Sequence, residues 1–198
     1  MTVYLIRHGV TDWNRAGRLQ GLEDIPLNAE GLRDAAECAR ILKPLPVDFV
    51  ASSPLLRAKM TAEILARALG VPLGVDERLI ERDFGRLSGL FPEERAAFLA
   101  AGQDPGSEPL EAVADRMLRA LDELARRHGR LLAVSHGASI NAVLARLSGG
   151  EIGSGKTLLI NTGVSRLSFR GGLWRVDFYN APADKALELA RELDGAGF

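Results

Sequence analysis

Residues 3–9 read Val-Tyr-Leu-Ile-Arg-His-Gly, and this stretch decides the class of fold. Its first four residues are apolar and partly β-branched, and the run then ends in a charged residue, a titratable residue and a glycine. A short apolar run of this kind is typical of a strand buried on both faces of a parallel sheet. Residues 3–6 therefore predict a central strand that delivers Arg7, His8 and Gly9 to a loop.

The rest of the chain alternates between helical and strand patterns. Asn28 is the expected N-cap of a helix that runs to about Lys43. Ser53 followed by Pro54 predicts the start of the next helix, which Gly70 ends. The other expected helices cover about residues 92–101, 110–128, 137–147 and a segment from about Ala183, and the other expected strands cover residues 48–51, 131–134, 158–160, 164–169 and 173–178.

This order of elements predicts the architecture. Strands separated by helices favour an α/β three-layer sandwich, in which a mostly parallel central sheet has an antiparallel edge and helices on both faces. A length of 198 residues favours a single domain over residues 1–198. Glycine and proline break the pattern from about 71 to 108, so we expect this segment to be a lid or insertion over the site.

The charge balance excludes several classes of partner. Lys and Arg number 25 and Asp and Glu number 26, so the chain has no global basic field to attract nucleic acid or an anionic membrane. Local arginines would have to hold an anionic substrate. Cys38 is the only cysteine and the N-terminus lacks a signal-peptide pattern, which leads us to expect a cytoplasmic protein without disulfides. No stretch approaches the roughly 18 apolar residues of a membrane span.

Candidate functional residues follow the expected strands. In open α/β sheets, ligands bind beyond the carboxyl ends of the strands. Arg7 and His8 follow the first strand, Arg57 lies in the first turn after the second strand, and His136 follows the strand at 131–134. A lone histidine is more often structural, and a lone arginine is more often a surface charge. Four such residues at neighbouring strand ends favour a joint site.

The tripeptide Arg-His-Gly also occurs at residues 127–129, so the tripeptide alone is a weak signal. His128 lies seven residues after Leu121 on the apolar face of an expected helix, and Gly129 stands where a C-cap glycine belongs. We therefore interpret this copy as packing and capping, outside the site.

A second string carries a phosphate-binding pattern. Residues 150–157 read Gly-Glu-Ile-Gly-Ser-Gly-Lys-Thr and match the Walker A pattern in full. That motif binds phosphate where a strand precedes the glycines and a helix follows, because the helix N-terminus and backbone amides then hold the anion. Here a helix precedes and a strand follows. This order favours a flexible connection, with a P-loop NTPase as the remote alternative.

Two histidines and two arginines favour chemistry on an anion. Two histidines could bind zinc, but no His-x-x-x-His pair or carboxylate ligand set stands beside either, so the sequence supports no metal site. Guanidinium groups bind phosphate or carboxylate through charge-assisted hydrogen bonds. A neutral imidazole can then act as a nucleophile toward the bound phosphorus.

These residues resemble the histidine phosphatase superfamily, the phosphoglycerate mutase-like group, and the resemblance covers nearly the whole chain. Residues 5–9, followed by Thr11-x-Trp13-Asn14, are similar to the family's opening signature, with Val10 where Glu is commoner. The other matching segments are Gly17-Arg18-Leu19-Gln20-Gly21, Asp24-x-Pro26-Leu27-Asn28, Ser52-Ser53-Pro54-Leu55-x-Arg57-Ala58, Leu79-x-Glu81-x-x-Phe84-Gly85, Val134-Ser135-His136-Gly137 and Asn161-Thr162-Gly163-Val164-Ser165.

The resemblance implies a role for each matching residue. His8 would attack phosphorus to form a phosphohistidine, while Arg7, Arg57 and His136 would bind the phosphoryl oxygens. Glu81 would protonate the leaving alkoxide and later activate water. The residues implied to line the substrate pocket are Asn14, Gln20, Gly21 and Gly137. Two arginines and a second histidine can stabilise the phosphoryl charge without magnesium, so no metal and no cofactor are expected.

Phosphatase and mutase activities remain to be separated. The resemblance implies that a cofactor-dependent mutase would be a longer chain, with an extended insertion whose basic residues hold a second phosphate. In this sequence Arg95 is the only basic residue between Gly89 and Leu110. We therefore expect a phosphatase that takes a small phosphorylated metabolite as its substrate, with phosphoglycerate mutase as the alternative. A non-catalytic phospholigand-binding module is disfavoured because binding alone would not need both His8 and Glu81. The oligomeric state is open.

Overall fold

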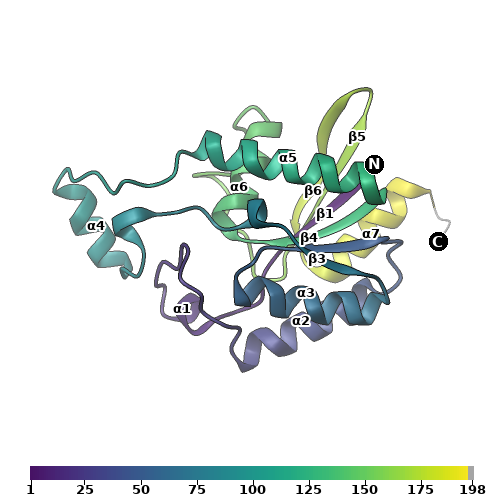
Figure 1. Cartoon of the computed structure of the whole chain (residues 1–198), viewed down its shortest axis with the longest axis horizontal. Helices are drawn as coiled ribbons and strands as arrows, with labels where there is room; N and C mark the ends of the chain where they lie inside the picture. The colour runs from purple at the N-terminus through teal and green to yellow at the C-terminus, as the bar shows by residue number, and fades with distance from the viewer. Residues whose placement is uncertain (196–198) are drawn as a thin grey trace.

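The computed structural model describes residues 1–195 and shows one six-stranded sheet with helices on both faces (Figure 1). The last three residues of the expected domain lie outside this range. The strands are β1 (Thr2–Arg7), β2 (Phe49–Ser52), β3 (Leu73–Val75), β4 (Arg130–Ser135), β5 (Val164–Arg170) and β6 (Leu173–Ala181). Their order in the sheet is β3-β2-β4-β1-β5-β6. The first four strands are parallel, and β5 is antiparallel to both of its neighbours, β1 and β6. The expected α/β class and mostly parallel sheet are confirmed.

Seven α-helices connect or flank the strands over the described residues. They are α1 (Asp12–Arg15), α2 (Ala29–Leu42), α3 (Leu56–Leu69), α4 (Pro92–Ala100), α5 (Leu110–His128), α6 (Gly137–Leu147) and α7 (Ala183–Asp194). Asn28 caps α2 as predicted, because its side-chain oxygen accepts a hydrogen bond from the amide of Gly31 at 2.9 Å. Gly70 ends α3 with a left-handed φ of 70°, a conformation that glycine adopts at little cost.

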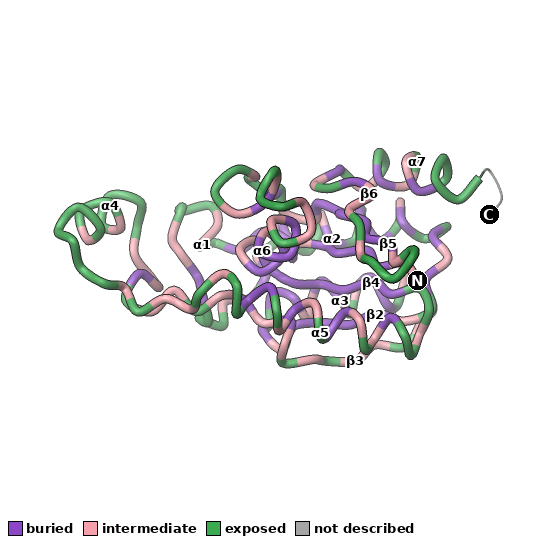
Figure 2. Tube along the Cα trace, turned by 90° about the horizontal axis from the view of Figure 1, so that it is seen from above, coloured by how far each residue is buried: buried purple, intermediate pink, exposed green. Residues whose placement is uncertain are grey.

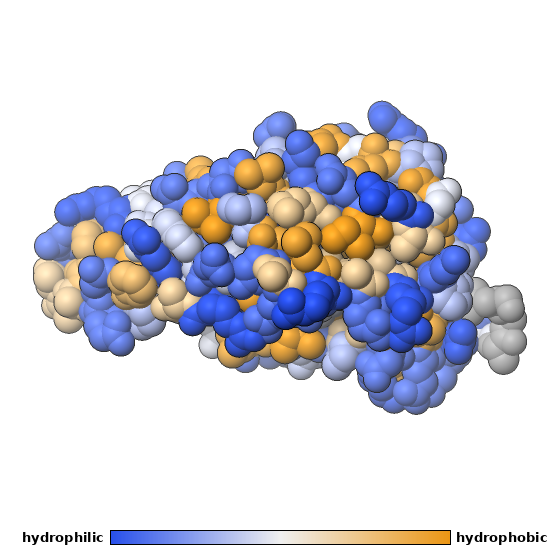
Figure 3. All heavy atoms as spheres, turned by 90° about the horizontal axis from the view of Figure 1, so that it is seen from below, coloured by the Kyte–Doolittle hydropathy of each residue, from blue (hydrophilic) through white to orange (hydrophobic). Residues whose placement is uncertain are grey.

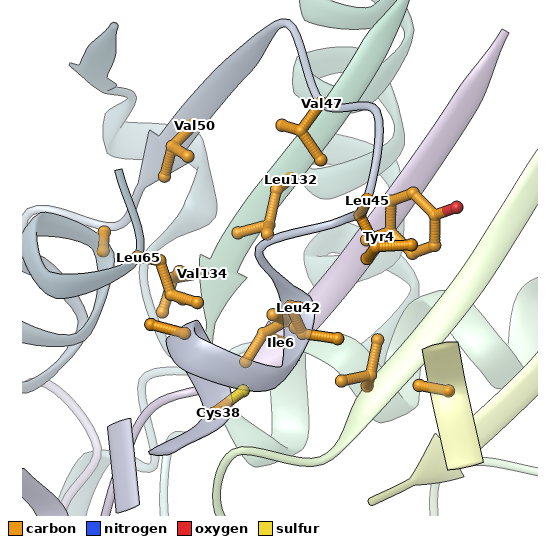
Figure 4. Close-up of a cluster of buried hydrophobic side chains, with 14 of the residues drawn as sticks. Tyr4, Ile6, Cys38, Leu42, Leu45, Val47, Val50, Leu65, Leu132 and Val134 are labelled. Carbon is orange, nitrogen blue, oxygen red and sulfur yellow. The ribbon is translucent and has the colours of Figure 1, made fainter. Parts of the chain in front are cut away.

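Two hydrophobic cores lie on opposite faces of the sheet. Successive side chains of a strand point to opposite faces, so Tyr4 and Ile6 join the core against α2, α3 and α7 (Figure 4), while Val3 and Leu5 join the core against α5 and α6. All four side chains are almost completely buried. Burial of one large aliphatic side chain stabilises the fold by about 1.5–3 kcal/mol. The continuous apolar run at 3–6 is thus explained by burial on both faces (Figure 2).

Three expectations about local structure were wrong. Residues 158–160 form no strand, because both sides of β5 are already paired, one with β1 and the other with β6. The backbone of this segment instead bonds the side chain of Asn180, which accepts from Ile160 N at 2.8 Å and donates to Leu158 O at 3.0 Å. Helix α3 begins at Leu56 with no side-chain cap, so Ser53 and Pro54 do not start it. Residues 73–75, inside the segment expected to be a lid, form the edge strand β3.

Helix α4 lies at one end of the molecule, away from the sheet (Figures 1 and 2). None of its residues is buried, and helix α1 lies at the same end. Seen from below, the body presents hydrophobic side chains in the middle of the face with hydrophilic side chains around them (Figure 3). Over residues 1–195, the structure contains no helix long and apolar enough to cross a membrane.

Candidate active site

The carboxyl ends of β1 and β4 place two histidines side by side. Arg7 of β1 pairs in register with Ser135 of β4, so the next residue on each strand, His8 and His136, are also neighbours. Their ring centroids are 5.2 Å apart and their planes are inclined by 58°. This convergence is what the sequence predicted from the two His-Gly steps.

A cleft of about 410 Å³ opens over these residues. Most of the predicted site residues line it, namely Arg7, His8, Asn14, Gln20, Gly21, Arg57, Glu81 and Gly137. His136 lies beneath the wall of the cleft and is fully buried against His8. The structure therefore brings all nine predicted residues to one place.

His8 is held in one orientation by its own loop. Its Nδ1 lies 2.7 Å from the carbonyl oxygen of Gly9, and because a carbonyl only accepts, Nδ1 must donate the proton. Asn161 donates to the His8 carbonyl at 2.9 Å, and Gly9 N donates to the hydroxyl of Thr61 at 3.0 Å, so the loop is fixed from both sides. The remaining nitrogen, Nε2, makes no hydrogen bond within the described residues and keeps a free lone pair.

The surroundings of His8 favour its neutral form. Burial lowers the pKa of His8 well below its usual value of 6.5, and the positive charges of Arg57 and Arg7 lower it further. The hydrogen bond to Gly9 opposes these effects only in part. At neutral pH the imidazole is therefore neutral, with its proton on Nδ1, and Nε2 keeps the lone pair that a nucleophile needs.

The two arginines keep donors available for an anion. Arg57 is 1% exposed, and its two terminal nitrogens donate to the carbonyls of Glu23 at 2.6 Å and Gly21 at 2.8 Å. Burial lowers the pKa of Arg57 to about 10, so the side chain stays charged at neutral pH. Arg7 donates through Nη1 to the carbonyl of Leu159. The Nε atoms of both arginines are buried and have no hydrogen-bond partner among residues 1–195, a costly state that a bound anion would relieve.

His136 is anchored from the second strand. Its Nε2 lies 2.7 Å from the hydroxyl of Ser53, which explains why that serine follows β2 rather than capping α3. Burial lowers the pKa of His136 well below 6.5, and the positive charges of Arg57 and Arg7 lower it further. Its Nδ1 is buried and has no hydrogen-bond partner in the described part of the chain, so it is a further ring atom that a bound group could satisfy.

Glu81 is fixed at the N-terminus of α6. Its carboxylate accepts hydrogen bonds from Ser139 N at 2.9 Å, Ser139 Oγ at 3.0 Å and Ala138 N at 3.2 Å. Unpaired backbone amides at a helix N-terminus attract negative charge, so α6 positions this side chain by electrostatics as well as by geometry. Glu81 is 7% exposed and faces the cleft.

Arg116 of α5 holds the segment that carries Glu81. Its guanidinium donates to the carbonyls of Arg78 at 2.8 Å, Ile80 at 2.7 Å and Glu81 at 3.1 Å, and it forms an ion pair with Glu108 at 2.8 Å. The backbone around Glu81 is therefore tied to a helix 35 residues further along the chain.

Asn14 and Gln20 are oriented through Thr11. The side-chain oxygen of Asn14 accepts from Thr11 N at 3.1 Å, and the side-chain oxygen of Gln20 accepts from the Thr11 hydroxyl at 3.0 Å. Because a backbone amide only donates, the Thr11 N–H identifies the acceptor end of Asn14 as its oxygen, so the amide nitrogen of Asn14 is left as a donor on the cleft wall.

Both rejected motifs lie where the sequence predicted. His128 stacks on Phe49 with ring centroids 3.9 Å apart, and Gly129 caps α5 through a bond to Ala125 O. The Walker-like string at 150–157 connects α6 to β5, no helix follows it, and Lys156 Nζ donates to the carbonyl of Gly150 at 2.6 Å.

Sequence reasoning missed several residues of the cleft and its supports. Arg18 and Arg95 line the cleft, while Asn161, Ser53 and Arg116 support its catalytic candidates. Asn161 stood within a matching segment, which was the only available signal for it. Among residues 1–195, no group of three or more His, Cys, Asp and Glu side chains is arranged to hold a metal ion.

The fold and the cleft define an α/β enzyme whose sheet presents two arginines and two neutral histidines to an anion. The chain belongs to the histidine phosphatase superfamily (branch 1), whose family model matches residues 3–182. It is a histidine phosphatase or phosphoglycerate mutase-like enzyme, as the sequence resemblance indicated.

Individual relatives carry both activities in their names. The chain is 39% identical over 180 residues to the uncharacterized phosphatase PhoE of Bacillus subtilis, covering 90% of this chain and 93% of that protein. It is 34% identical over 188 residues to the probable phosphoglycerate mutase GpmB of Salmonella choleraesuis, covering 88% and 87%. The phosphoserine phosphatase of Entamoeba histolytica, solved in complex with 3-phosphoglyceric acid, matches with a TM-score of 0.78 and 30% identity, covering 91% of this chain and 96% of that one.

Proposed function

We propose that this enzyme hydrolyses small phosphate monoesters through a phosphohistidine formed on His8, without a metal ion. The observation that carries the proposal is the hydrogen bond from His8 Nδ1 to the Gly9 carbonyl, since it leaves Nε2 as the nucleophile. Arg7 and Arg57 lie beside it with unpaired buried Nε donors. The family membership supports the same reading.

The first half of the proposed reaction transfers the phosphoryl group to the enzyme. The Nε2 lone pair attacks phosphorus, the P–O bond to the alcohol breaks, and the leaving alkoxide takes a proton from the carboxyl of Glu81. Charge builds on the three equatorial oxygens, where the two arginines and His136 stabilise it. In the second half, water loses a proton to the Glu81 carboxylate and its oxygen attacks phosphorus. The P–N bond breaks, its electron pair returns to His8 Nε2, and inorganic phosphate is released.

Trapping the intermediate tests the nucleophile. A phosphohistidine has a labile P–N bond, so a labelled substrate quenched during turnover should leave phosphate on His8 that is lost in acid and kept in base. His8→Ala should lose both the label and the turnover, whereas His128→Ala, which removes the histidine outside the cleft, should keep both. Full turnover in His8→Ala would exclude the covalent route. EDTA should leave the rate unchanged.

Leaving-group dependence tests the general acid. Glu81→Gln should slow alkyl phosphates far more than activated aryl phosphates, because only a poor leaving group needs a proton. General acid catalysis contributes about 100- to 10,000-fold, which sets the expected size of this difference. Equal slowing of both substrate types would remove Glu81 from the acid role.

Phosphoglycerate mutase is the second candidate, supported by the likeness to GpmB. A mutase returns the phosphoryl group to a second hydroxyl and must exclude water from the phosphoenzyme. Incubation with 3-phosphoglycerate separates the two: a phosphatase releases inorganic phosphate, and a mutase yields 2-phosphoglycerate.

The segment from Asp76 to Pro109 carries Glu81, Phe84 and Arg95 to the cleft, and we propose that it acts as the lid.

A further inference from the structure

The turn that precedes β5 contains a residue in an unusual backbone conformation. Thr162 has a φ of 57°, and in the described part of the chain only one other non-glycine residue, Asn180, has a positive φ. Thr162 is the third residue of a four-residue turn, which the bond from Gly163 N to Ile160 O closes at 3.1 Å. A left-handed backbone is costly for a β-branched residue, and residues of this kind persist where their surroundings hold them, often at functional sites.

The turn is held against the end of strand β1. Thr162 N donates to Arg7 O at 2.9 Å, and Arg7 N donates to Gly163 O at 3.2 Å. The guanidinium of Arg7 donates to the carbonyl of Leu159, which precedes the turn. The Thr162 hydroxyl donates within the turn, to Asn161 O at 2.7 Å. Together these bonds keep Thr162 in its left-handed conformation and fix the turn relative to β1.

The turn presents the side chain of Asn161 to the loop that carries His8. The amide nitrogen Nδ2 of Asn161 lies 2.9 Å from His8 O, 3.2 Å from Gly9 O and 3.4 Å from Asn14 Oδ1. The first two acceptors are backbone carbonyl oxygens, which only accept, so the end of the amide that faces them is the nitrogen. Asn161 does not line the cleft, so it acts on the loop rather than on a bound ligand.

The carbonyl of Gly9 connects Asn161 to the imidazole of His8. This one oxygen accepts from His8 Nδ1 at 2.7 Å and from Asn161 Nδ2 at 3.2 Å. In a neutral imidazole, the hydrogen bond made by one ring nitrogen determines whether the other nitrogen carries the proton. If the Gly9 carbonyl turned away from the ring, Nδ1 would lose its acceptor, and the proton could move to Nε2 and occupy its lone pair.

We propose that Asn161 is a positioning residue for the nucleophile. Aimed by the left-handed backbone of Thr162, its amide fixes the Gly9 carbonyl, and this carbonyl keeps the His8 proton on Nδ1 and the lone pair on Nε2. The inference deepens the proposed function, on which its catalytic part rests. The tautomer of His8, in contrast, is a property of the protein without substrate and can be measured without turnover.

NMR measures this tautomer directly. In a long-range proton–nitrogen correlation spectrum of the 15N-labelled protein at neutral pH, a protonated ring nitrogen and one with a free lone pair give well-separated signals. His8→Gln identifies the signals of His8 by their loss. The wild-type protein should carry the His8 proton on Nδ1, and Asn161→Ala should shift the population toward the tautomer with the proton on Nε2. Asn161→Ser, which is also too short to reach Gly9 O, should show the same shift and replaces Asn161→Ala if that variant does not fold.

Asn180→Gly is the matched control. Asn180 is the other residue with a positive φ, and its side chain bonds the same turn at Ile160 N and the segment before it at Leu158 O, without a bond to His8. Glycine keeps the left-handed backbone at low cost, so this variant removes only the side chain. It should leave the His8 signals unchanged. An equal shift in Asn180→Gly would overturn the assignment to Asn161, because a looser turn would then be sufficient.

Kinetics test the catalytic part. Asn161→Ala should lower kcat by about 10- to 100-fold, since a displacement of about 1 Å at a reacting group can cost about 100-fold. The affinity for inorganic phosphate, measured by calorimetry, should stay at the wild-type value, because the bonds from Arg7 to Leu159 and from Arg57 to Gly21 remain. Thr162→Gly should keep both values, since glycine adopts the same backbone at low cost. A parallel loss of kcat and phosphate affinity in Asn161→Ala would overturn the positioning role in favour of a structural one.

The two readouts separate this inference from the phosphatase function. A tautomer shift in Asn161→Ala supports the positioning role even if the wild-type protein hydrolyses no monoester, and then only the phosphatase function fails. Unchanged His8 signals and unchanged kcat in Asn161→Ala, in a wild-type protein that does hydrolyse monoesters, overturn the inference and leave the phosphatase function standing.

Discussion

The two buried histidines should make the protein acid-sensitive well above the range in which carboxylates titrate. The pKa values of His8 and His136 lie well below 6.5 in the folded state, first because of burial and then because of Arg57 and neighbouring charges. In the unfolded chain both return to about 6.5. Below that pH the unfolded chain binds more protons than the folded one, so stability falls as the pH falls.

The expected size follows from linkage. Each group whose folded pKa lies below the pH contributes a slope of about 1.4 kcal/mol per pH unit in this window. Between pH 6.5 and about pH 5, one such histidine lowers the free energy of unfolding by up to about 2 kcal/mol, and the pair by up to about 4 kcal/mol. Against a total stability of about 5–15 kcal/mol for a domain, this is a large fraction.

Urea unfolding at pH 7.5, 6.5, 5.5 and 5 measures this slope. The buffer must lack phosphate and sulfate, because an anion bound to the arginines would stabilise the folded state. The His8→Gln/His136→Gln double variant should lose most of the slope, while His128→Gln controls for the removal of a histidine outside the cleft. Stability that stays level from pH 7.5 to pH 5 in the wild-type protein, or the same slope in the double variant, would refute the reasoning.

Three further predictions concern residues outside the cleft lining. Lys156→Ala should leave phosphatase turnover and ATP binding unchanged, because the Lys156 ammonium donates to a carbonyl of its own loop, that of Gly150. If the substitution abolished ATP binding, the P-loop NTPase alternative would be supported. Gly31→Ala should lower the free energy of unfolding by about 1–3 kcal/mol in urea titrations, since the new methyl would lie 2.1 Å from the carbonyl of Val10; an unchanged midpoint would contradict that contact. Arg116→Lys should slow alkyl phosphates about 10- to 100-fold while sparing aryl phosphates, because lysine cannot hold all three carbonyls around Glu81; equal slowing would make Arg116 only structural.

The sequence sufficed for those parts of the fold and site that local pattern determines. The apolar run at 3–6 is buried on both faces, and its carboxyl end lies beside that of β4, so the meeting of His8 and His136 could be predicted from strand ends alone. Around residues 150–157 the predicted helix before the string is present, and the next element after the string is the strand β5 rather than a helix, although the strand expected at 158–160 does not form.

Other features depend on contacts between distant segments. Glu81 is one of 26 acidic residues, and what distinguishes it is the N-terminus of α6, whose Ser139 lies 58 residues further along the chain. The apolar run at 158–160 looks like a strand, but both sides of β5 are already paired with β1 and β6, and Leu158 is 89% exposed. Ser53 has the composition of an N-cap, yet its hydroxyl is taken by His136.

The pairing of β1 with β4 has a consequence for how this enzyme can change. Neighbouring strands are held about 4.8 Å apart by their backbone hydrogen bonds, and the 5.2 Å between the two imidazole rings follows from that spacing. The positions of His8 and His136 are therefore set by the sheet, whereas Asn14 and Gln20 are carried by the segment between β1 and α2. Substitution in that segment can alter which ligand the cleft accepts while His8 and His136 stay in place, so the choice of ligand and the pair of histidines are free to evolve separately.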